Sequence, residues 1–260
     1  MNDNDELPRA VGAILREARH VVVFSGAGVS AESGIPTFRD ALTGLWGRFD
    51  AAELASAEGF AADPELVWGW YEWRRMSVMR GQPNAAHRAI AALASKVPKL
   101  TLVTQNVDDL HERAGSEGVV HLHGSLFAPR CFDCGRPASL ASDVPDEPEG
   151  GRRFAPPRCD SCGGPVRPGV VWFGEMLPEG ALQQASDAAR SCDVLLSIGT
   201  SSVVFPAAQI PVDAHRAGAK LIQINPNATD LDAIADLNLR GTAAMVVPAL
   251  VRAVGVQADG

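Results

Sequence analysis

The sequence lacks any long hydrophobic run and any apolar leader at its start. Nowhere in the 260 residues do 18 apolar residues follow one another, which is roughly the length that a transmembrane helix needs. The first ten residues, MNDNDELPRA, are polar and acidic and do not have the apolar core of a signal peptide. The sequence therefore predicts a soluble, cytoplasmic protein that does not bind a membrane.

Basic residues are also in the minority. The chain has 23 Lys and Arg against 31 Asp and Glu, which gives a net charge of −8 and a pI of about 5.2. A broad phosphate-binding surface needs the opposite balance, so direct nucleic-acid binding is not predicted. An acidic surface instead favours lysine-rich protein partners. The sequence leaves the oligomeric state open.

Apolar segments of strand and helix type alternate along the chain. With 46% hydrophobic residues, it can bury one large domain, or one domain with an insertion. Repeated strand–turn–helix units predict an α/β fold with a Rossmann-like, doubly wound, mainly parallel sheet. We expect strands near residues 20–24, 100–103, 119–122, 193–198, 220–224 and 243–247, and helices over 7–18, 64–81, 85–93, 182–190 and 207–217.

A glycine turn follows the first predicted strand, with Gly26 and Gly28 ahead of an expected helix start. Glycines let the backbone approach a diphosphate, and free N–H groups then point at it. The usual third glycine is replaced by Ala31, and no clear ribose-binding acid follows. The residues alone leave a dinucleotide cradle and a purely structural turn as equal alternatives.

Polar side chains follow two further strands. Residues 104–108 come directly after the strand near 100–103, and His123 closes the apolar stretch 119–122. An α/β sheet places its ligand site at the carboxyl ends of its strands. We therefore expect the ligand site here. His87, at the start of the helix near 85–93, is interpreted as a capping or packing residue.

The helix expected over residues 64–81 has a guanidinium within its apolar arc. At about 100° per residue, Arg74 falls near the centre of that arc, whereas Glu72 and Arg75 fall outside it and are expected to be solvated. A charge on an apolar face is costly unless an anion meets it. Arg74 could pair with an internal carboxylate, or could read an anionic ligand together with Tyr71, one turn earlier.

Four of the five cysteines form two Cys-x-x-Cys pairs separated by 24 residues, each followed by glycine. Such pairs can wrap one zinc ion with four thiolates, and four sulfurs leave no open position for a reactive water. The predicted zinc is therefore structural, with Cys131, Cys134, Cys159 and Cys162 as ligands. Zinc ribbons also bind nucleic acid, but the arginines here are mixed with acids and lack an aromatic platform. Cys192 is expected to be a buried apolar residue.

These motifs together resemble the sirtuins, the NAD-dependent protein-lysine deacylases, from about residue 9 onward. The resemblance rests on residues 26–39 (GAGVSAESGIPTFR), 104–108 (TQNVD), 121–124 (HLHG), 170–175 (VVWFGE), 199–201 (GTS) and 224–225 (IN), and on the four cysteines. It implies an NAD-binding Rossmann-like domain (residues 1–38, 82–125 and 171–260). It also implies a cofactor loop with a helical acyl-pocket module (39–81), and an inserted zinc ribbon (126–170).

The resemblance implies that NAD is a co-substrate that is consumed. The residues expected to contact it are Gly26, Ala27, Gly28, Glu32, Phe38, Arg39, Trp46, Gln105, Asn106, Val107, Asp108, Gly199, Thr200, Ser201, Asn225 and Ala243. In the family's chemistry the acyl oxygen displaces nicotinamide from the ribose. His123, the implied general base, then helps a ribose hydroxyl attack the imidate, and Asn106 is the other implied catalytic residue. The products are nicotinamide, O-acyl-ADP-ribose and free lysine.

The spacing of Tyr71 and Arg74 resembles the class III branch, which removes acidic acyl groups such as succinyl and malonyl. Ala55 is expected to line the same tunnel, and Val171, Phe173 and Gly174 are expected to pair with the backbone of an acyl-lysine peptide. A sirtuin acting mainly as a deacetylase or mono-ADP-ribosyltransferase is the alternative within the family. A zinc-ribbon nucleic-acid-binding module on an inactive scaffold is the alternative outside it.

Overall fold

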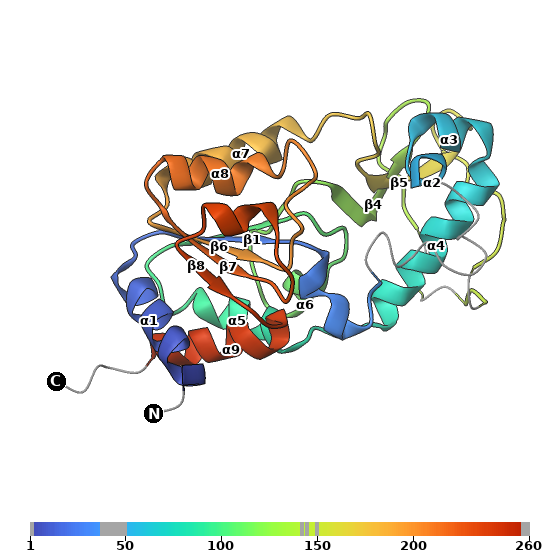
Figure 1. The fold of residues 1–260 in the computed structure, drawn as a ribbon. Helices are drawn as coiled ribbons and strands as arrows, with labels where there is room; N and C mark the ends of the chain where they lie inside the picture. Colours follow the sequence, from blue (N-terminus) through green and yellow to red (C-terminus); the bar gives the residue numbers. More distant parts are fainter. Residues whose placement is uncertain (1–2, 37–50, 141–142, 144–145, 149–150, 256–260) are drawn as a thin grey trace.

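A six-stranded parallel sheet forms the centre of the computed structural model, which describes residues 3–36, 51–140, 143, 146–148 and 151–255 (Figure 1). The strands are β1 (Val21–Ser25), β2 (Leu100–Thr104), β3 (Val120–His121), β6 (Val194–Ile198), β7 (Lys220–Ile224) and β8 (Leu237–Leu239). Their order, β3-β2-β1-β6-β7-β8, is the Rossmann order. The order reverses between β1 and β6, which is where such sheets bind their ligands.

Helices cover both faces of the sheet, so the predicted doubly wound fold is confirmed. On one face lie α1 (Asp3–Glu17), α5 (Ala85–Leu93) and α9 (Ala243–Val254); on the other lie α7 (Glu179–Ser191) and α8 (Gln209–Arg216) (Figure 1). Every residue of β1 and β6 is buried, as expected for central strands covered on both sides. Within the described residues, no helix has the length and apolarity to cross a bilayer.

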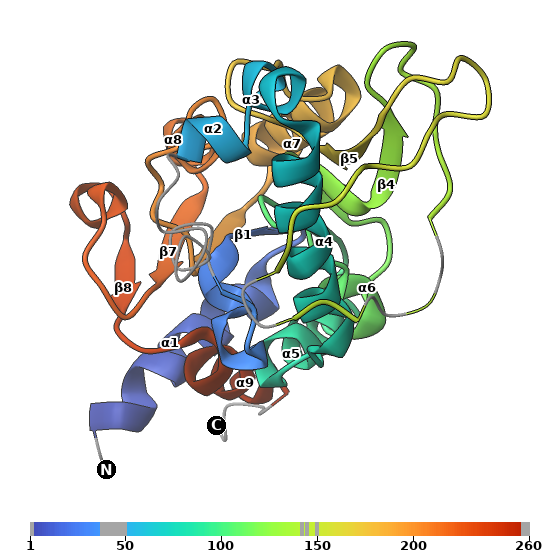
Figure 2. The ribbon, with the colours of Figure 1, turned by 90° about the vertical axis from the view of Figure 1, so that its right-hand side faces the viewer.

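A smaller part of the molecule stands beside the sheet in Figure 1 and faces the viewer in Figure 2. It contains α2 (Ala51–Leu54), α3 (Ala57–Ala62), α4 (Pro64–Arg80) and an antiparallel pair, β4 (Gly124–Cys131) with β5 (Val166–Val170). The Asp63 carboxylate caps α4 by accepting the Leu66 N–H at 3.1 Å. Phe60, Trp70 and Trp172 are fully buried in the core of this part. The short helix α6 (Leu110–Arg113) follows β2.

The strand predicted over residues 243–247 is wrong, because this segment begins α9. The apolar run continues to Val254, and its buried residues Val247, Leu250 and Val254 recur at helical spacing. The last strand is instead β8, only three residues long and interrupted by the polar Asn238. A strand that short gives too few positions for a pattern.

Glu72 and Arg75 were expected to be solvated, but both are buried. They form a two-pronged ion pair, with Arg75 Nε 2.9 Å from Glu72 Oε1 and Nη2 2.8 Å from Oε2. The reason is that a distant segment crosses the outer side of α4: a Cβ at Gly69 would lie 1.8 Å from the Arg152 carbonyl oxygen. Helical periodicity cannot reveal a second covering layer supplied by residues so far along the chain.

Candidate active site

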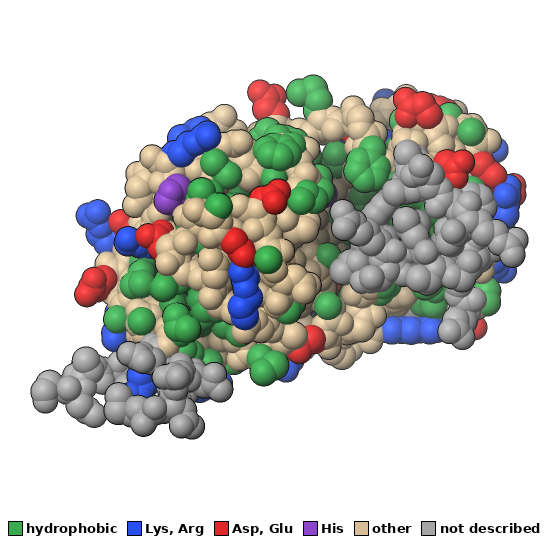
Figure 3. All heavy atoms as spheres, viewed as in Figure 1, with side chains coloured by type: hydrophobic (Ala, Val, Ile, Leu, Met, Phe, Trp, Pro, Cys, Tyr) green, Lys and Arg blue, Asp and Glu red, His purple; other side chains and the backbone are tan. Residues whose placement is uncertain are grey.

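A cavity of about 1040 Å³ opens at the carboxyl ends of the central strands. Figure 3 shows the surface of the molecule in the view of Figure 1. Among its lining residues are Gly26, Ala27, Gly28, Glu32, Ala55, Tyr71, Arg74, Gln105, Asn106, Val107, Asp108, His123, Val171, Phe173, Gly174, Gly199, Thr200, Ser201, Asn225 and Ala243. Every predicted cofactor, catalytic and substrate residue that the structure describes therefore lines one cavity. Phe38, Arg39 and Trp46 lie outside the described residues.

Two glycine-containing loops touch at the floor of the cavity. The Gly28 N–H donates to the Gly199 carbonyl at 2.8 Å, and a Cβ at Gly28 would lie 2.8 Å from Gly199 Cα. The expected helix after Gly28 is absent, since residues 27–33 form two short 3₁₀ turns. In a dinucleotide fold the third glycine serves close helix–strand packing. Residues 31–33 form a 3₁₀ turn and the Ala31 side chain is exposed, so no glycine is needed at that position.

The loops after β2, β6 and β7 meet at Thr200. Gln105 Nε2 donates to Thr200 Oγ1 at 2.8 Å, and Asn225 Nδ2 donates to the Thr200 carbonyl at 2.9 Å. At the same side, Glu32 accepts the Ala244 N–H at 3.0 Å, at the start of α9. The buried Thr242 Oγ1, also in the cavity wall, has no hydrogen-bond partner among the described residues. Glycines such as Gly28 and Gly199 have no Cβ atom to obstruct a diphosphate, and the Thr242 hydroxyl can form a hydrogen bond with a ligand. Both features fit a dinucleotide.

Ser30 connects two of the predicted site residues, and sequence reasoning missed it. Its Oγ donates to Asp108 Oδ2 at 3.0 Å and accepts from Asn106 Nδ2 at 3.1 Å. Burial raises the pKa of the Asp108 carboxyl, although the Leu110 N–H and the Ser30 hydroxyl stabilise its charged form. The network fixes the orientation of Asn106 and Asp108 beneath the cavity. The only sequence signal for Ser30 was its place inside the glycine motif.

His87 lies beneath this network and confirms the capping interpretation. Its Nδ1 accepts the Asn84 N–H at 3.3 Å within a capping box at the start of α5. It is fully buried, its ring centroid is 4.9 Å from that of His111, and burial lowers the pKa of His87 to about 4. His87 is therefore uncharged at neutral pH.

His123 has the arrangement of a general base. Its Nδ1 lies 3.0 Å from the Gln105 carbonyl oxygen. A carbonyl oxygen only accepts, so Nδ1 carries the proton and Nε2 keeps its lone pair. Burial lowers the pKa of His123 below its usual value of 6.5, although the Gln105 carbonyl acts in the opposite direction. The imidazole is therefore neutral at pH 7 and able to accept a proton.

Tyr71 and Arg74 lie side by side in the wall that α4 contributes. Arg74 Cζ is 4.8 Å from the centroid of the Trp70 ring and 5.8 Å from that of Tyr71. Burial raises the pKa of Tyr71 to about 12, so its hydroxyl keeps its proton. Burial lowers the pKa of the Arg74 guanidinium, but an arginine remains charged in proteins. The wall therefore presents a cation and a hydroxyl, with the buried Ala55 in the same cavity.

The four paired cysteines bring their sulfur atoms together at the end of the β4–β5 module. All four Sγ atoms lie within 4.8 Å of one another, with 3.4 Å between Cys131 and Cys162 and 3.8 Å between Cys134 and Cys159. A tetrahedral zinc ion with Zn–S bonds of about 2.3 Å separates its sulfurs by about 3.8 Å. The cluster therefore fits a structural zinc ion. Cys192 is buried, as predicted.

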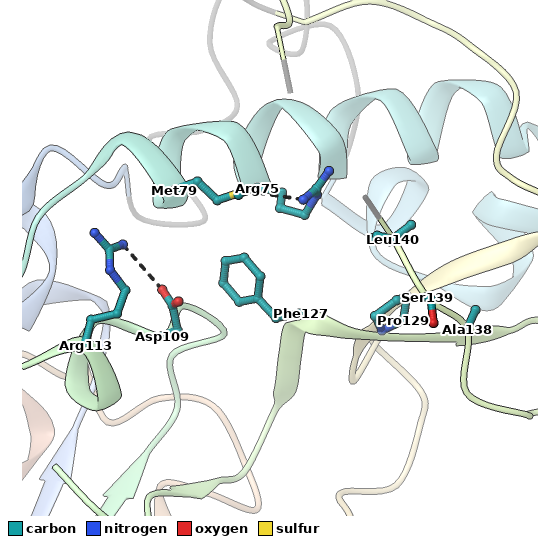
Figure 4. A pocket seen from close by; sticks show the side chains of 9 residues that line it. All are labelled: Arg75, Met79, Asp109, Arg113, Phe127, Pro129, Ala138, Ser139 and Leu140. Atoms are coloured by element: carbon teal, nitrogen blue, oxygen red, sulfur yellow. Dashed lines mark hydrogen bonds and ion pairs between the residues drawn. The ribbon is translucent and has the colours of Figure 1, made fainter. Parts of the chain in front are cut away.

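A second hollow of about 600 Å³ lies between α4, α6 and β4 (Figure 4). Its charged groups make ion pairs within the chain: Arg113 is 3.6 Å from Asp109, and Arg75 pairs with Glu72. Its lining contains neither the glycine loops nor His123, which line the larger cavity instead. The larger cavity is therefore the better candidate for a reaction site.

The sheet has the Rossmann strand order, with glycine loops at the point where the order reverses and a neutral histidine in the cavity. These features define a nucleotide-binding α/β protein, and the inserted four-cysteine module adds a structural metal site. Residues 26–206 match the Sir2 family. The chain belongs to this family.

Similar proteins extend over nearly the whole chain. A protein from Methylococcus capsulatus named NAD-dependent protein deacylase is 64% identical over 241 residues, or 93% of this chain and 94% of that protein. A Sir2 homologue solved with NAD is 46% identical, with a TM-score of 0.87 and coverage of 98% of this chain and 94% of that chain. A Sir2 protein bound to a myristoylated histone peptide is 38% identical, with a TM-score of 0.76 and 95% coverage of both chains.

Proposed function

We propose that this protein, an NAD-dependent protein deacylase of the Sir2 family, removes acidic acyl groups from protein lysine in preference to acetyl. Succinyl and malonyl are the proposed groups, and the products are nicotinamide, O-acyl-ADP-ribose and free lysine. The deacylase name of the Methylococcus relative and the NAD complex of the Sir2 homologue support the activity. The peptide complex of a Sir2 protein supports acyl-lysine substrates.

The observation that carries the acyl preference is the pairing of Tyr71 with Arg74 in the cavity wall. A guanidinium and a hydroxyl can both donate to a carboxylate, and hydrogen bonds to a charged acceptor are the stronger ones. An acetyl group is too short and too apolar to meet either donor. Polar groups that a substrate leaves without partners lower its relative kcat/KM.

The two halves of the cavity suggest how the substrates would lie. NAD would occupy the side of Gly26, Gly28 and Gly199, and supplies the ribose that receives the acyl group. His123 Nε2 would take the proton from the attacking ribose hydroxyl. The segment at Val171 and Phe173 is held extended, since its N–H groups donate to the His123 and Ala55 carbonyls, each at 2.8 Å. A peptide backbone would lie along this segment.

Substitution of Arg74 tests the proposal. With NAD and matched peptides, the wild type should have the higher kcat/KM on succinyl-lysine. Arg74→Met should lower that value by roughly 10- to 100-fold, because a charge-assisted hydrogen bond is lost, while acetyl turnover survives. Arg80→Met is the matched control, since Arg80 is an exposed arginine of the same helix.

A wild type that prefers acetyl-lysine, together with an Arg74→Met variant that changes neither value, would contradict the acyl assignment. The result would then favour an enzyme that acts mainly as a deacetylase. Failure of both peptides to release nicotinamide would contradict the deacylase activity itself.

A further inference from the structure

We infer that Trp172 is a specificity-determining positioning residue, because its indole N–H turns the Tyr71 hydroxyl into a donor aimed at the carboxylate of an acidic acyl group. The inference rests on the proposed function and extends it from the residues that meet the acyl group to a neighbouring residue of the cavity wall that acts through Tyr71.

The hydrogen bond between the two side chains has only one possible direction. Trp172 Nε1 lies 3.0 Å from Tyr71 Oη, and both residues are buried. An indole nitrogen can only donate, so the tyrosine oxygen accepts here. The hydroxyl hydrogen must then point elsewhere, and no acceptor for it is found among the residues that the structure describes. Tyr71 lines the cavity, so a ligand oxygen can supply that acceptor.

The indole itself is held from two sides. Arg167, on β5, places its Cζ 3.4 Å from the centroid of the Trp172 ring. Glu175 accepts the Trp172 backbone N–H at 2.8 Å and the Arg167 Nη2 at 3.0 Å. Phe60 adds a ring contact with a centroid distance of 5.3 Å. A side chain packed in this way cannot turn its N–H away from Tyr71 without breaking several contacts.

The direction of the hydroxyl decides what it can recognise. A carboxylate only accepts hydrogen bonds, so it binds a hydroxyl that donates and gains nothing from one that accepts. Without the indole N–H, the Tyr71 hydroxyl is free to rotate and to donate its hydrogen bond to another group. Binding of an acidic acyl group should then weaken, whereas a neutral acyl chain of the same length should be affected only through packing.

A double-mutant cycle tests the inference, with kcat and KM measured separately on succinyl-lysine and butyryl-lysine peptides. Trp172→Phe keeps a large ring but removes the donor. It should reduce kcat/KM for succinyl-lysine about tenfold more than for butyryl-lysine, as should Tyr71→Phe. The double variant should lose little more than either single variant, since both remove the same interaction. Trp68→Phe is the control, because Trp68 is a buried tryptophan of α4 outside the cavity wall.

Equal losses on both peptides, or losses from Trp172 and Tyr71 that multiply, would show that Trp172 only packs and would overturn the inference. Arg74→Met separates failure of this inference from failure of the proposed function. If only the inference fails, the wild type still prefers succinyl-lysine and Arg74→Met removes that preference. If the proposed function fails, the wild type shows no succinyl preference. Zinc content and melting temperature report folding. If Trp172→Phe unfolds, 3-benzothienylalanine at position 172 replaces only the indole N–H by sulfur and gives the same comparison.

Discussion

Replacing His123 by alanine should lower deacylation by about 100- to 10,000-fold, the usual contribution of a general base. The Nδ1 proton is fixed by the Gln105 carbonyl 3.0 Å away, so Nε2 is the atom that would accept a proton from the substrate. NAD binding, measured by calorimetry, should persist, because the glycine loops and Thr200 are untouched. Single-turnover product formation measures the loss.

The pH dependence of kcat/KM is a second test of the role of His123. Because burial lowers the pKa of His123 below 6.5, the base form prevails at neutral pH. The wild-type kcat/KM should therefore be level near pH 7 and fall only as the pH drops below about 6.5. The His123→Ala variant should lose this acid limb. His215→Ala, at an exposed histidine of α8, is the control, and a His123→Ala variant within about threefold of wild type would exclude the base role.

Removal of the zinc should unfold the β4–β5 module and abolish activity. Without their ion, the four cysteine side chains no longer join the two Cys-x-x-Cys turns. Phe132, between Cys131 and Cys134, would lose its ring contact with Phe60, whose centroid is 5.0 Å away. The same aromatic cluster contains Trp172, which lines the cavity, so the damage should reach the cavity wall.

The expected change is large. Cys131→Ser should lower the melting temperature by about 10 °C or more and remove bound zinc, which elemental analysis measures. Cys192→Ala is the matched control: this buried cysteine is not one of the four clustered thiols, so the variant should keep both zinc and turnover. A zinc-free protein with unchanged melting temperature and kcat/KM would contradict a structural role.

The sheet and its cavity could be predicted because their signals are local. Short buried strands such as β1 and β6 are apolar runs in the sequence. Polar residues follow other strands of the sheet, Gln105 after β2 and Asn225 after β7, and they lie at the predicted edge. The four cysteines also come together as their spacing indicated.

Contacts between distant residues could not be predicted in this way. Ser30 binds Asp108, 78 residues later, and Trp172 binds Tyr71, 101 residues earlier. Neither pairing leaves a periodic pattern in the sequence. The burial of Arg75 has the same origin, since a remote segment covers the outer side of α4. Local patterns identify the elements, whereas the fold determines which side chains act together.

A competition assay tests the acyl preference most directly. Succinyl-lysine and acetyl-lysine peptides of the same sequence are mixed in equal amounts with NAD and the wild-type protein, and the two O-acyl-ADP-ribose products are separated by mass. The ratio of initial product amounts equals the ratio of kcat/KM values. The pairing of Tyr71 with Arg74 predicts that O-succinyl-ADP-ribose exceeds O-acetyl-ADP-ribose by at least roughly tenfold. An excess of the acetyl product would contradict it.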